Sequence, residues 1–201
     1  MIGTLPLLLG LFVVASACAQ DDHMNGEAEA AGHMEHADMP PMRANDEARP
    51  SPNAGVMATI GTTSVMVHYG RPSLRGRAYF ADGSELAPAG AVWRTGANEA
   101  PTITFADDVI FGGEPVAAGT YALFSIPGDE WTVILNATAQ QWGSFRYDEA
   151  EDVVRVMAEP MTDAPMQEQF EIRFQDITED SATLILHWGT VGVPVTIQAG
   201  M

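Results

Sequence analysis

The feature that most constrains this chain is a series of short apolar runs, beginning near Gly55 and interrupted by turn residues at intervals of about ten positions. In the later runs apolar and polar residues alternate. Phe170, Ile172 and Phe174 share one face, and the sequences ATLILHWG and VPVTIQ repeat the pattern. One apolar and one polar face per strand is typical of an antiparallel sheet. The pattern therefore predicts an all-β domain over residues 53–199.

The number of runs indicates how the strands are arranged. About eight to ten strands in a domain of this length favour two packed antiparallel sheets, a jelly-roll-like β-sandwich, with a closed barrel as the alternative. We expect two hairpins, one joining residues 56–61 to 64–70 and one joining residues 120–126 to 131–137. The second hairpin surrounds a Pro-Gly-Asp sequence, which favours a turn.

The N-terminal residues 5–17 form an apolar run, LPLLLGLFVVASA, which is too short to span a bilayer but suits the core of a signal peptide. The run ends in small residues and is followed by the lone cysteine of the chain, Cys18. Residues 1–18 are therefore predicted to be a signal peptide with a lipobox that ends at Cys18. Cleavage before Cys18 would leave a thiol that carries a lipid and anchors the protein in a membrane. Ordinary signal-peptidase cleavage after Ala19, which would discard Cys18, is the alternative and gives a soluble secreted protein. We therefore expect an exported protein, periplasmic or attached to the outer membrane.

Residues 19–52 have no apolar periodicity and are rich in Ala, Glu, Asp, Met and Pro, so we expect a disordered tether. The segment carries imidazole and thioether groups, which suit copper, with Met favouring Cu(I) and His favouring Cu(II). Their spacing matches no recognised closed site, and an incidental occurrence in a low-complexity linker is the alternative. The candidate copper ligands are His23, Met24, His33, Met34, His36, Met39 and Met42, with Asp38 beside them.

The charge of the chain excludes one class of partner. Asp and Glu number 27 against 9 basic residues, all of them arginine, and the formal net charge is −18. A protein with this charge repels nucleic acids, so we exclude nucleic-acid binding.

Arginines gather in one part of the predicted domain, just before and within the segment WRTGANE at residues 93–99. This segment adds an aromatic ring, an amide and a carboxylate, and its Gly-Ala pair permits close backbone approach. Arginine forks beside an aromatic plane suit a small anionic or sugar ligand: a carboxylate, a phosphate or a sugar acid. The alternative is an internal network in which Glu99 bridges arginines and fixes the loop. The candidate ligand-binding residues are Arg71, Arg75, Arg77, Trp93, Arg94, Asn98 and Glu99.

An enzymatic function has weaker support. His68 and His187 are the histidines of the predicted domain, and each lies opposite the main apolar face of its strand. If both strands face one cleft, these histidines and Glu99 form a metal site or an acid–base group. The alternative is that both are strand histidines with a structural or solvent-exposed position. No nucleophile elbow, phosphate-binding loop or zinc-helix motif occurs, so no catalytic residues are assigned.

The chain carries several short motifs, among them YGRP at 69–72, RGR at 75–77, WRTGANE at 93–99 and EWTVILN at 130–136. With these motifs it resembles a bacterial family of exported proteins known as a domain of unknown function (number twenty-nine eleven). WRTGANE is the most specific of them, and the resemblance extends from Ser51 to about Ile197. It implies a single exported domain, and it implies no activity, ligand or catalytic residue. The motifs are SP at 51–52, YGRP at 69–72, RGR at 75–77, WRTGANE, GG at 112–113, AGTY at 118–121, FSIPG at 124–128, EWTVILN at 130–136 and WG at 142–143.

These observations favour an exported, lipid-anchored β-sandwich protein that acts as a non-enzymatic binding or envelope module. Two alternatives remain open. One is a copper-handling lipoprotein that works through the His/Met tail, and the other is a hydrolase-type enzyme with a site near residues 93–99.

Overall fold

The computed structural model describes Met1 and residues 49–200, and the fold reported below is that of residues 49–200. They form eleven strands and one short 3-10 helix, η1 (Glu149–Glu151). Within this part of the chain, no helix is long and apolar enough to cross a membrane.

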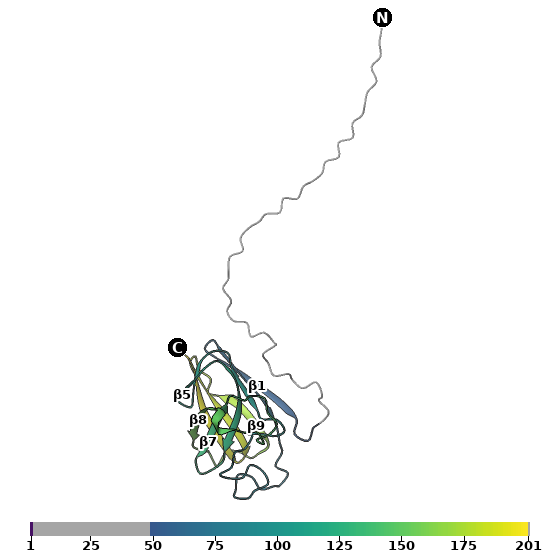
Figure 1. The fold of residues 1–201 in the computed structure, drawn as a ribbon, viewed down its shortest axis with the longest axis vertical. Coiled ribbons are helices and arrows are strands. Elements are labelled where there is room, and N and C mark those ends of the chain that lie inside the picture. Colours follow the sequence, from purple (N-terminus) through teal and green to yellow (C-terminus); the bar gives the residue numbers. More distant parts are fainter. Residues whose placement is uncertain (2–48, 201) are drawn as a thin grey trace. The chain divides into compact units, whose positions relative to one another are not determined.

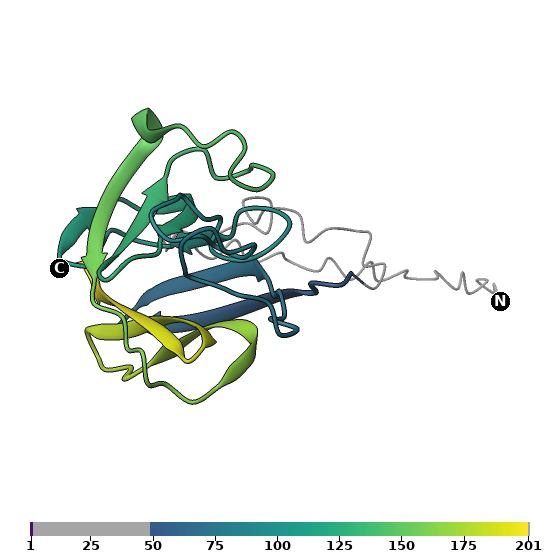
Figure 2. The same ribbon diagram turned by 90° about the horizontal axis from the view of Figure 1, so that it is seen from below.

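The strands form two antiparallel sheets, which Figures 1 and 2 show as two layers. The six-stranded sheet contains, in spatial order, β1 (Asn53–Ile60), β2 (Thr63–Gly70), β3 (Thr102–Phe105), β6 (Gly119–Ile126), β7 (Trp131–Asn136) and β8 (Asp152–Ala158). The five-stranded sheet contains β5 (Glu114–Val116), β4 (Val109–Phe111), β11 (Val191–Ala199), β10 (Ser181–Gly189) and β9 (Gln167–Gln175).

The predicted fold class is confirmed: the domain is a β-sandwich, and neither sheet closes on itself into a barrel. The two predicted hairpins are the pairs β1–β2 and β6–β7. The strand count exceeds the expected eight to ten because β4 and β5 have only three residues each. A strand of three residues is too short to display an alternating pattern in the sequence.

The core lies between the sheets because alternate side chains of each strand point inward. In β2, Val65, Val67 and Tyr69 are buried, and in β10 Leu184 and Leu186 are buried. One end of this core is a group of aromatic rings in contact with one another: Tyr79, Phe80, Trp93, Trp131, Phe170 and Trp188.

The two sheets are joined along one side of the sandwich. The Tyr69 hydroxyl accepts a hydrogen bond from the Ile172 amide at 3.0 Å and donates to the Ile172 carbonyl at 3.3 Å. Beyond β2 the chain continues along β9, where the Phe170 amide donates to the Pro72 carbonyl at 2.8 Å and the Leu74 amide to the Glu168 carbonyl at 3.0 Å. Residues 72–74, which follow β2, therefore lie beside β9 of the five-stranded sheet.

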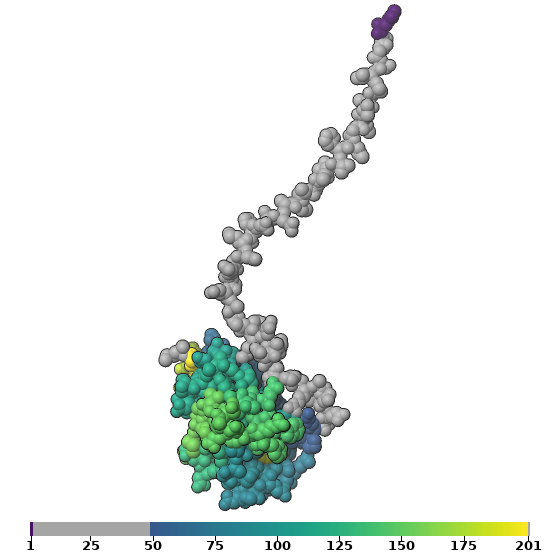
Figure 3. All heavy atoms as spheres, viewed as in Figure 1, coloured from purple at the N-terminus to yellow at the C-terminus, as the bar shows by residue number. Residues whose placement is uncertain are grey.

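A second, smaller apolar cluster lies on the outer face of the six-stranded sheet. Its buried members are Ala100, Ala122, Phe124 and Ile134, and the Tyr147 ring packs on it. We name residues 137–148, which connect β7 to η1 and lie over this cluster, the covering segment. In the space-filling view, green atoms of this part of the chain and of the strand that follows form much of the face turned to the viewer (Figure 3).

Candidate ligand site on the outer face of the six-stranded sheet

Residues 92–94 extend the six-stranded sheet beside β6 and turn neighbouring side chains to opposite faces. The Trp93 amide donates to the Ser125 carbonyl at 2.7 Å, and the Ser125 amide donates back to the Trp93 carbonyl at 3.0 Å. Trp93 points into the core, where its ring stacks on Trp188. Because neighbouring residues of an extended chain alternate, Arg94 points outward, and the half-buried Val92 packs on the outer cluster.

The loop that follows holds an unusual backbone conformation. Thr95 has a φ of 48° and Asn98 a φ of 66°, both in the left-handed region that non-glycine residues rarely occupy. A β-branched residue pays the greater steric cost there, and such strain persists only where surrounding contacts hold it. The Thr95 hydroxyl supplies one such contact, a hydrogen bond of 2.8 Å with the Ser125 hydroxyl.

Two glycines let this loop approach β2. A Cβ on Gly96 would lie 2.8 Å from the Gly70 carbonyl oxygen, and a Cβ on Gly70 would overlap the Ala97 carbonyl. Gly70 belongs to the YGRP motif and Gly96 to WRTGANE, so the two motifs meet in space. The contact requires the absence of both side chains.

The polar side chains at the end of the loop hold it to other segments. The side-chain amide of Asn98 donates a hydrogen bond to the Ser51 main-chain carbonyl at 3.0 Å. The main-chain carbonyl of Asn98 accepts a hydrogen bond from the Gly143 amide at 3.0 Å. Arg49 Nη1 lies 3.3 Å from both carboxylate oxygens of Glu99. Asn98 and Glu99 therefore take part in a network of the kind expected as the alternative, and Arg49 is one arginine that Glu99 contacts.

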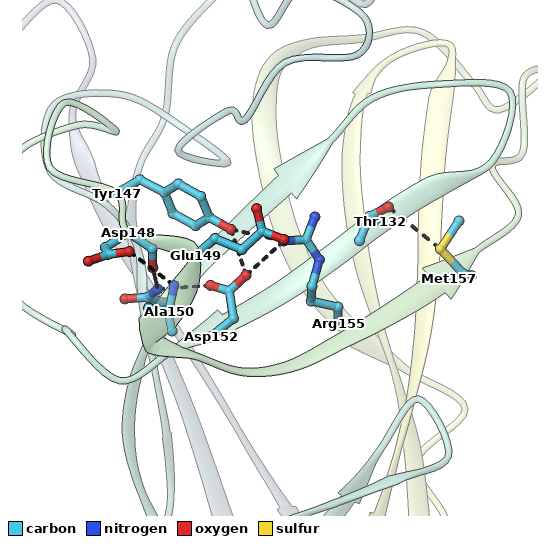
Figure 4. A network of polar contacts seen from close by, with 9 residues as sticks. Thr132, Tyr147, Asp148, Glu149, Ala150, Asp152, Arg155 and Met157 are labelled. Carbon is cyan, nitrogen blue, oxygen red and sulfur yellow. Dashed lines mark hydrogen bonds and ion pairs between the residues drawn. The ribbon is translucent and has the colours of Figure 1, made fainter.

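A network of polar contacts fixes the far end of the covering segment to β8 (Figure 4). The Tyr147 hydroxyl donates to an Asp152 carboxylate oxygen at 2.6 Å, and Arg155 Nη1 lies 2.9 Å from the same oxygen and 3.1 Å from Glu149. The buried Asn136 amide donates to the other Asp152 oxygen at 2.8 Å. Burial, and then the hydrogen bond and negative charge of Asp152, raise the pKa of the Tyr147 hydroxyl, so Tyr147 remains a protonated donor.

Three polar atoms between the sheet and the covering segment are buried without a hydrogen-bond partner: Arg94 Nε, Thr102 Oγ1 and Gln141 Oε1. None of the ion pairs among residues 49–200 includes Arg94. Burial lowers the pKa of the Arg94 guanidinium, the direction expected for a cation removed from water. Buried polar groups in folded proteins are usually paired, so three unpaired atoms in one region need an explanation.

Contacts between the segments that carry the three residues bring those segments close together. The Gln141 carbonyl accepts from the Ala100 amide at 3.1 Å, two residues before Thr102. A Cβ on Gly143 would lie 3.9 Å from the Arg94 Cδ, so the same stretch of the covering segment also touches the Arg94 stem. We name Arg94, Thr102 and Gln141 the Arg94 site.

The remaining candidate residues lie elsewhere. Arg71 Nε donates to the Phe170 carbonyl at 3.3 Å, and Arg77 donates to the Leu74 and Ser73 carbonyls at 3.1 and 2.8 Å, so both hold the turn beside β9. Arg75 is exposed. Trp93 is 7% exposed and packs on other rings, so it offers no open face to a ligand. Of the seven candidates, Arg94, Asn98 and Glu99 lie around the Arg94 site.

The two histidines lie on different sheets and have different partners. His68, on β2, has its Nε2 3.0 Å from the Met66 Sδ. His187, on β10, lies 2.9 Å from Arg173 Nη1 and 3.0 Å from the Pro165 carbonyl. Among residues 49–200, no group of three His, Cys, Asp or Glu side chains is placed to hold a metal ion.

A separate groove of about 440 Å³ lies between β4, β8 and β11. Gly112, Met157 and Pro194 contribute to its walls, and Glu159 is the charged residue of its lining. None of the residues proposed from the sequence lines this groove.

Some predicted features fall outside the described part of the chain. These are the lipidation residue Cys18 and the candidate copper ligands between His23 and Met42. Conversely, Thr102 and Gln141 were not predicted. They matter because their side-chain oxygens are buried without hydrogen-bond partners. The sequence does not reveal whether a given threonine or glutamine is buried and unpaired.

The comparisons with known proteins agree with this organisation. Residues 51–197 match the family described as "Protein of unknown function (DUF2911)". No curated protein and no solved structure matches the chain. The matched residues extend over nearly all of the β-sandwich and include every member of the Arg94 site. The chain therefore belongs to the DUF2911 family.

Proposed function

We propose that the domain is a binding module that holds a small anionic ligand at the Arg94 site. The observation that carries the proposal is the half-buried Arg94, whose Nε has no hydrogen-bond partner and which no carboxylate of residues 49–200 neutralises. Arginine keeps its charge in proteins, and a cation removed from water without a partner is costly. An anion bound to Arg94 would remove that cost.

The neighbouring atoms suggest what else the ligand carries. Arg94 Nε is a donor, Gln141 Oε1 is an acceptor, and the Thr102 hydroxyl can act as either. A ligand that satisfies all three needs an anionic acceptor and at least one hydroxyl donor. A sugar acid or another hydroxylated carboxylate meets this requirement. The dianion of a phosphate monoester has no donor for Gln141 on its phosphate group, whereas inorganic phosphate at neutral pH keeps a hydroxyl and serves as a smaller probe of the same site.

The strained loop supports a binding role for this region. Strain at Thr95 and Asn98 costs stability, and strained backbone is concentrated at binding and catalytic sites. Here the strained loop, the half-buried cation and the unpaired acceptor lie on segments that contact one another.

Thermal unfolding of the full chain, with and without ligand, tests the proposal. The probes are glucuronate, citrate and inorganic phosphate, each compared with sodium chloride at equal ionic strength. A ligand at one hundred times its Kd stabilises the folded state by about 2.7 kcal/mol, which raises the Tm of a domain of this size by roughly 5 to 10 °C. We expect glucuronate to give the largest shift.

Variants at Arg94 separate binding from structure. Arg94→Lys keeps the charge and the stem but loses the fork, so it should keep the Tm of the free protein and lose most of the ligand shift. Arg94→Gln should lose the shift completely. The control is Arg75→Gln, which removes an exposed arginine and should leave the shift intact. The proposal fails if none of the three anions stabilises the wild type, or if Arg94→Gln responds as the wild type does.

The place of this module in the cell is a further part of the proposal. The apolar run at residues 5–17 and the small residues before Cys18 support export and attachment to a membrane through a lipid on Cys18. The intact mass of the protein purified from membranes tests this. A lipidated protein is heavier than the cleaved chain by its acyl groups, and Cys18→Ser should be released without them.

A further inference from the structure

Three soft-metal ligands lie together on the outer face of the β1–β2 hairpin. Met57 of β1 and Met66 of β2 are paired across the strands, and His68 follows Met66 by two residues. Their neighbours Ala58, Val65 and Val67 are buried in the core, so these three side chains point away from it.

The histidine and one thioether are already in contact. His68 Nε2 lies 3.0 Å from Met66 Sδ. Side chains directly opposite in an antiparallel pair have Cβ atoms about 4.5 to 5.5 Å apart, which places the Met57 side chain within reach of the Met66 thioether. One nitrogen and two sulfur atoms can therefore converge without any change in the backbone.

The strand opposite His68 leaves room for its ring. The cross-strand partner of His68 is Gly55, and a Cβ there would lie 3.1 Å from His68 Nδ1. Because Gly55 has no side chain, the imidazole can lie over the backbone of β1. Met57 is 61% exposed, so an ion from solvent can reach its sulfur directly.

We propose that Met57, Met66 and His68 form a binding site for a soft monovalent metal ion, Cu(I). Thioether and imidazole groups are neutral ligands, and thioethers select Cu(I) over the hard cations that prefer carboxylates. The partners of Met66 and His68 on the next strand are Thr104 and Thr102, so no carboxylate occupies a paired position beside them.

The geometry requires only a small adjustment. A tetrahedral metal with a nitrogen at about 2.0 Å and a sulfur at about 2.3 Å separates those two atoms by roughly 3.5 Å. Rotation of the unbranched Met66 side chain supplies the remaining separation. The net charge of −18 favours the approach of a cation.

This site uses none of the residues of the Arg94 site, although it adjoins that site where His68 is paired with Thr102. It is also separate from the candidate ligands of residues 23–42, which carry the same chemical groups. A test must therefore report on individual residues, because total copper bound does not distinguish the hairpin from the tail.

Methionine-methyl NMR of the full chain provides that test, with Ag(I) as a redox-inert probe and Cu(I) added under anaerobic conditions. The Met57 and Met66 methyl signals, assigned from Met57→Leu and Met66→Leu, should shift as the metal is added. Met57 is exposed, so Met57→Leu tests the site even if Met66→Leu were to disturb packing. His68→Gln should weaken the metal response of both methyl signals by at least tenfold.

Met157 provides a matched control. It is 57% exposed, lies on a strand as Met57 does, and is paired with Thr132, with no histidine opposite it (Figure 4). Its methyl signal should remain in place at one equivalent of Ag(I), and Met157→Leu should leave the shifts of Met57 and Met66 unchanged. The proposal is wrong if the Met57 and Met66 signals move no more than the Met157 signal, or if His68→Gln has no effect on them.

Discussion

The Trp93 and Trp188 rings are stacked across the two sheets, with centroids 5.7 Å apart and planes inclined by 7°. Trp93 begins the WRTGANE segment, and its burial anchors that segment to the core. The anchoring determines the direction of the next residue: because Trp93 points inward, Arg94 points to the outer face. A packing contact in the core thus positions the cation on the outer face of the six-stranded sheet.

We expect Trp93→Ala to destabilise the domain by about 3 to 5 kcal/mol, the cost of removing a large buried aromatic side chain. Urea unfolding followed by circular dichroism measures the loss. Phe145, which is 83% exposed, provides the control, and Phe145→Ala should change the stability by no more than about 0.5 kcal/mol. Equal losses for the two variants would contradict the inward placement of Trp93.

Gly70→Ala should destabilise the domain strongly, by more than about 3 kcal/mol, because the new Cβ would overlap the Ala97 carbonyl and two backbone segments would have to separate. Gly76 is the comparison: nothing lies within 4 Å of a Cβ there, so Gly76→Ala carries only the cost of its φ of 71°, about 1 to 2 kcal/mol. Thermal unfolding of both variants checks the order. A milder effect at Gly70 than at Gly76 would refute the close contact of the two motifs.

Because of the Tyr147 hydroxyl, the free energy of unfolding should fall as the pH becomes alkaline. The pKa of Tyr147 is raised in the folded state, so its contribution is fully present below the unfolded value of about 10 and is lost as the pH rises above that value. Tyr147→Phe should cost about 1 kcal/mol at pH 7, and the difference from the wild type should shrink above pH 10. Urea unfolding at a series of pH values measures this, and a constant difference across the series would exclude the coupling.

The side chain of Asn136 should hold the covering segment against the sheet through its hydrogen bonds. Its side chain is fully buried, donates to the Asp148 carbonyl at 2.9 Å, and accepts from the Thr138 amide at 3.1 Å. Asn136→Ala leaves these groups unpaired, so we expect a loss of about 1 to 3 kcal/mol. Amide hydrogen exchange should accelerate in residues 137–148 more than in β10. Uniform acceleration over the whole domain would show instead that the covering segment does not open on its own.

The sequence by itself determined the fold class, because the two-residue alternation visible around Phe170 and Leu184 is the same alternation that places side chains on the two faces of a sheet. It also singled out the segment WRTGANE, whose Arg94 belongs to the site proposed above. The three-residue strands β4 and β5 were missed because no periodicity can be recognised over so short a length.

Only the tertiary structure decided which residues of the candidate site act together. The four arginines at 71, 75, 77 and 94 are close in sequence, yet Arg71 and Arg77 bond to carbonyls beside β9 while Arg94 lies on the outer face of the other sheet. Likewise, Met57 and Met66 become neighbours through the register of the hairpin. Alternation in a sequence reports which face a side chain takes within its own strand, whereas the pairing of strands and the burial of Arg94 depend on contacts between segments far apart in the chain.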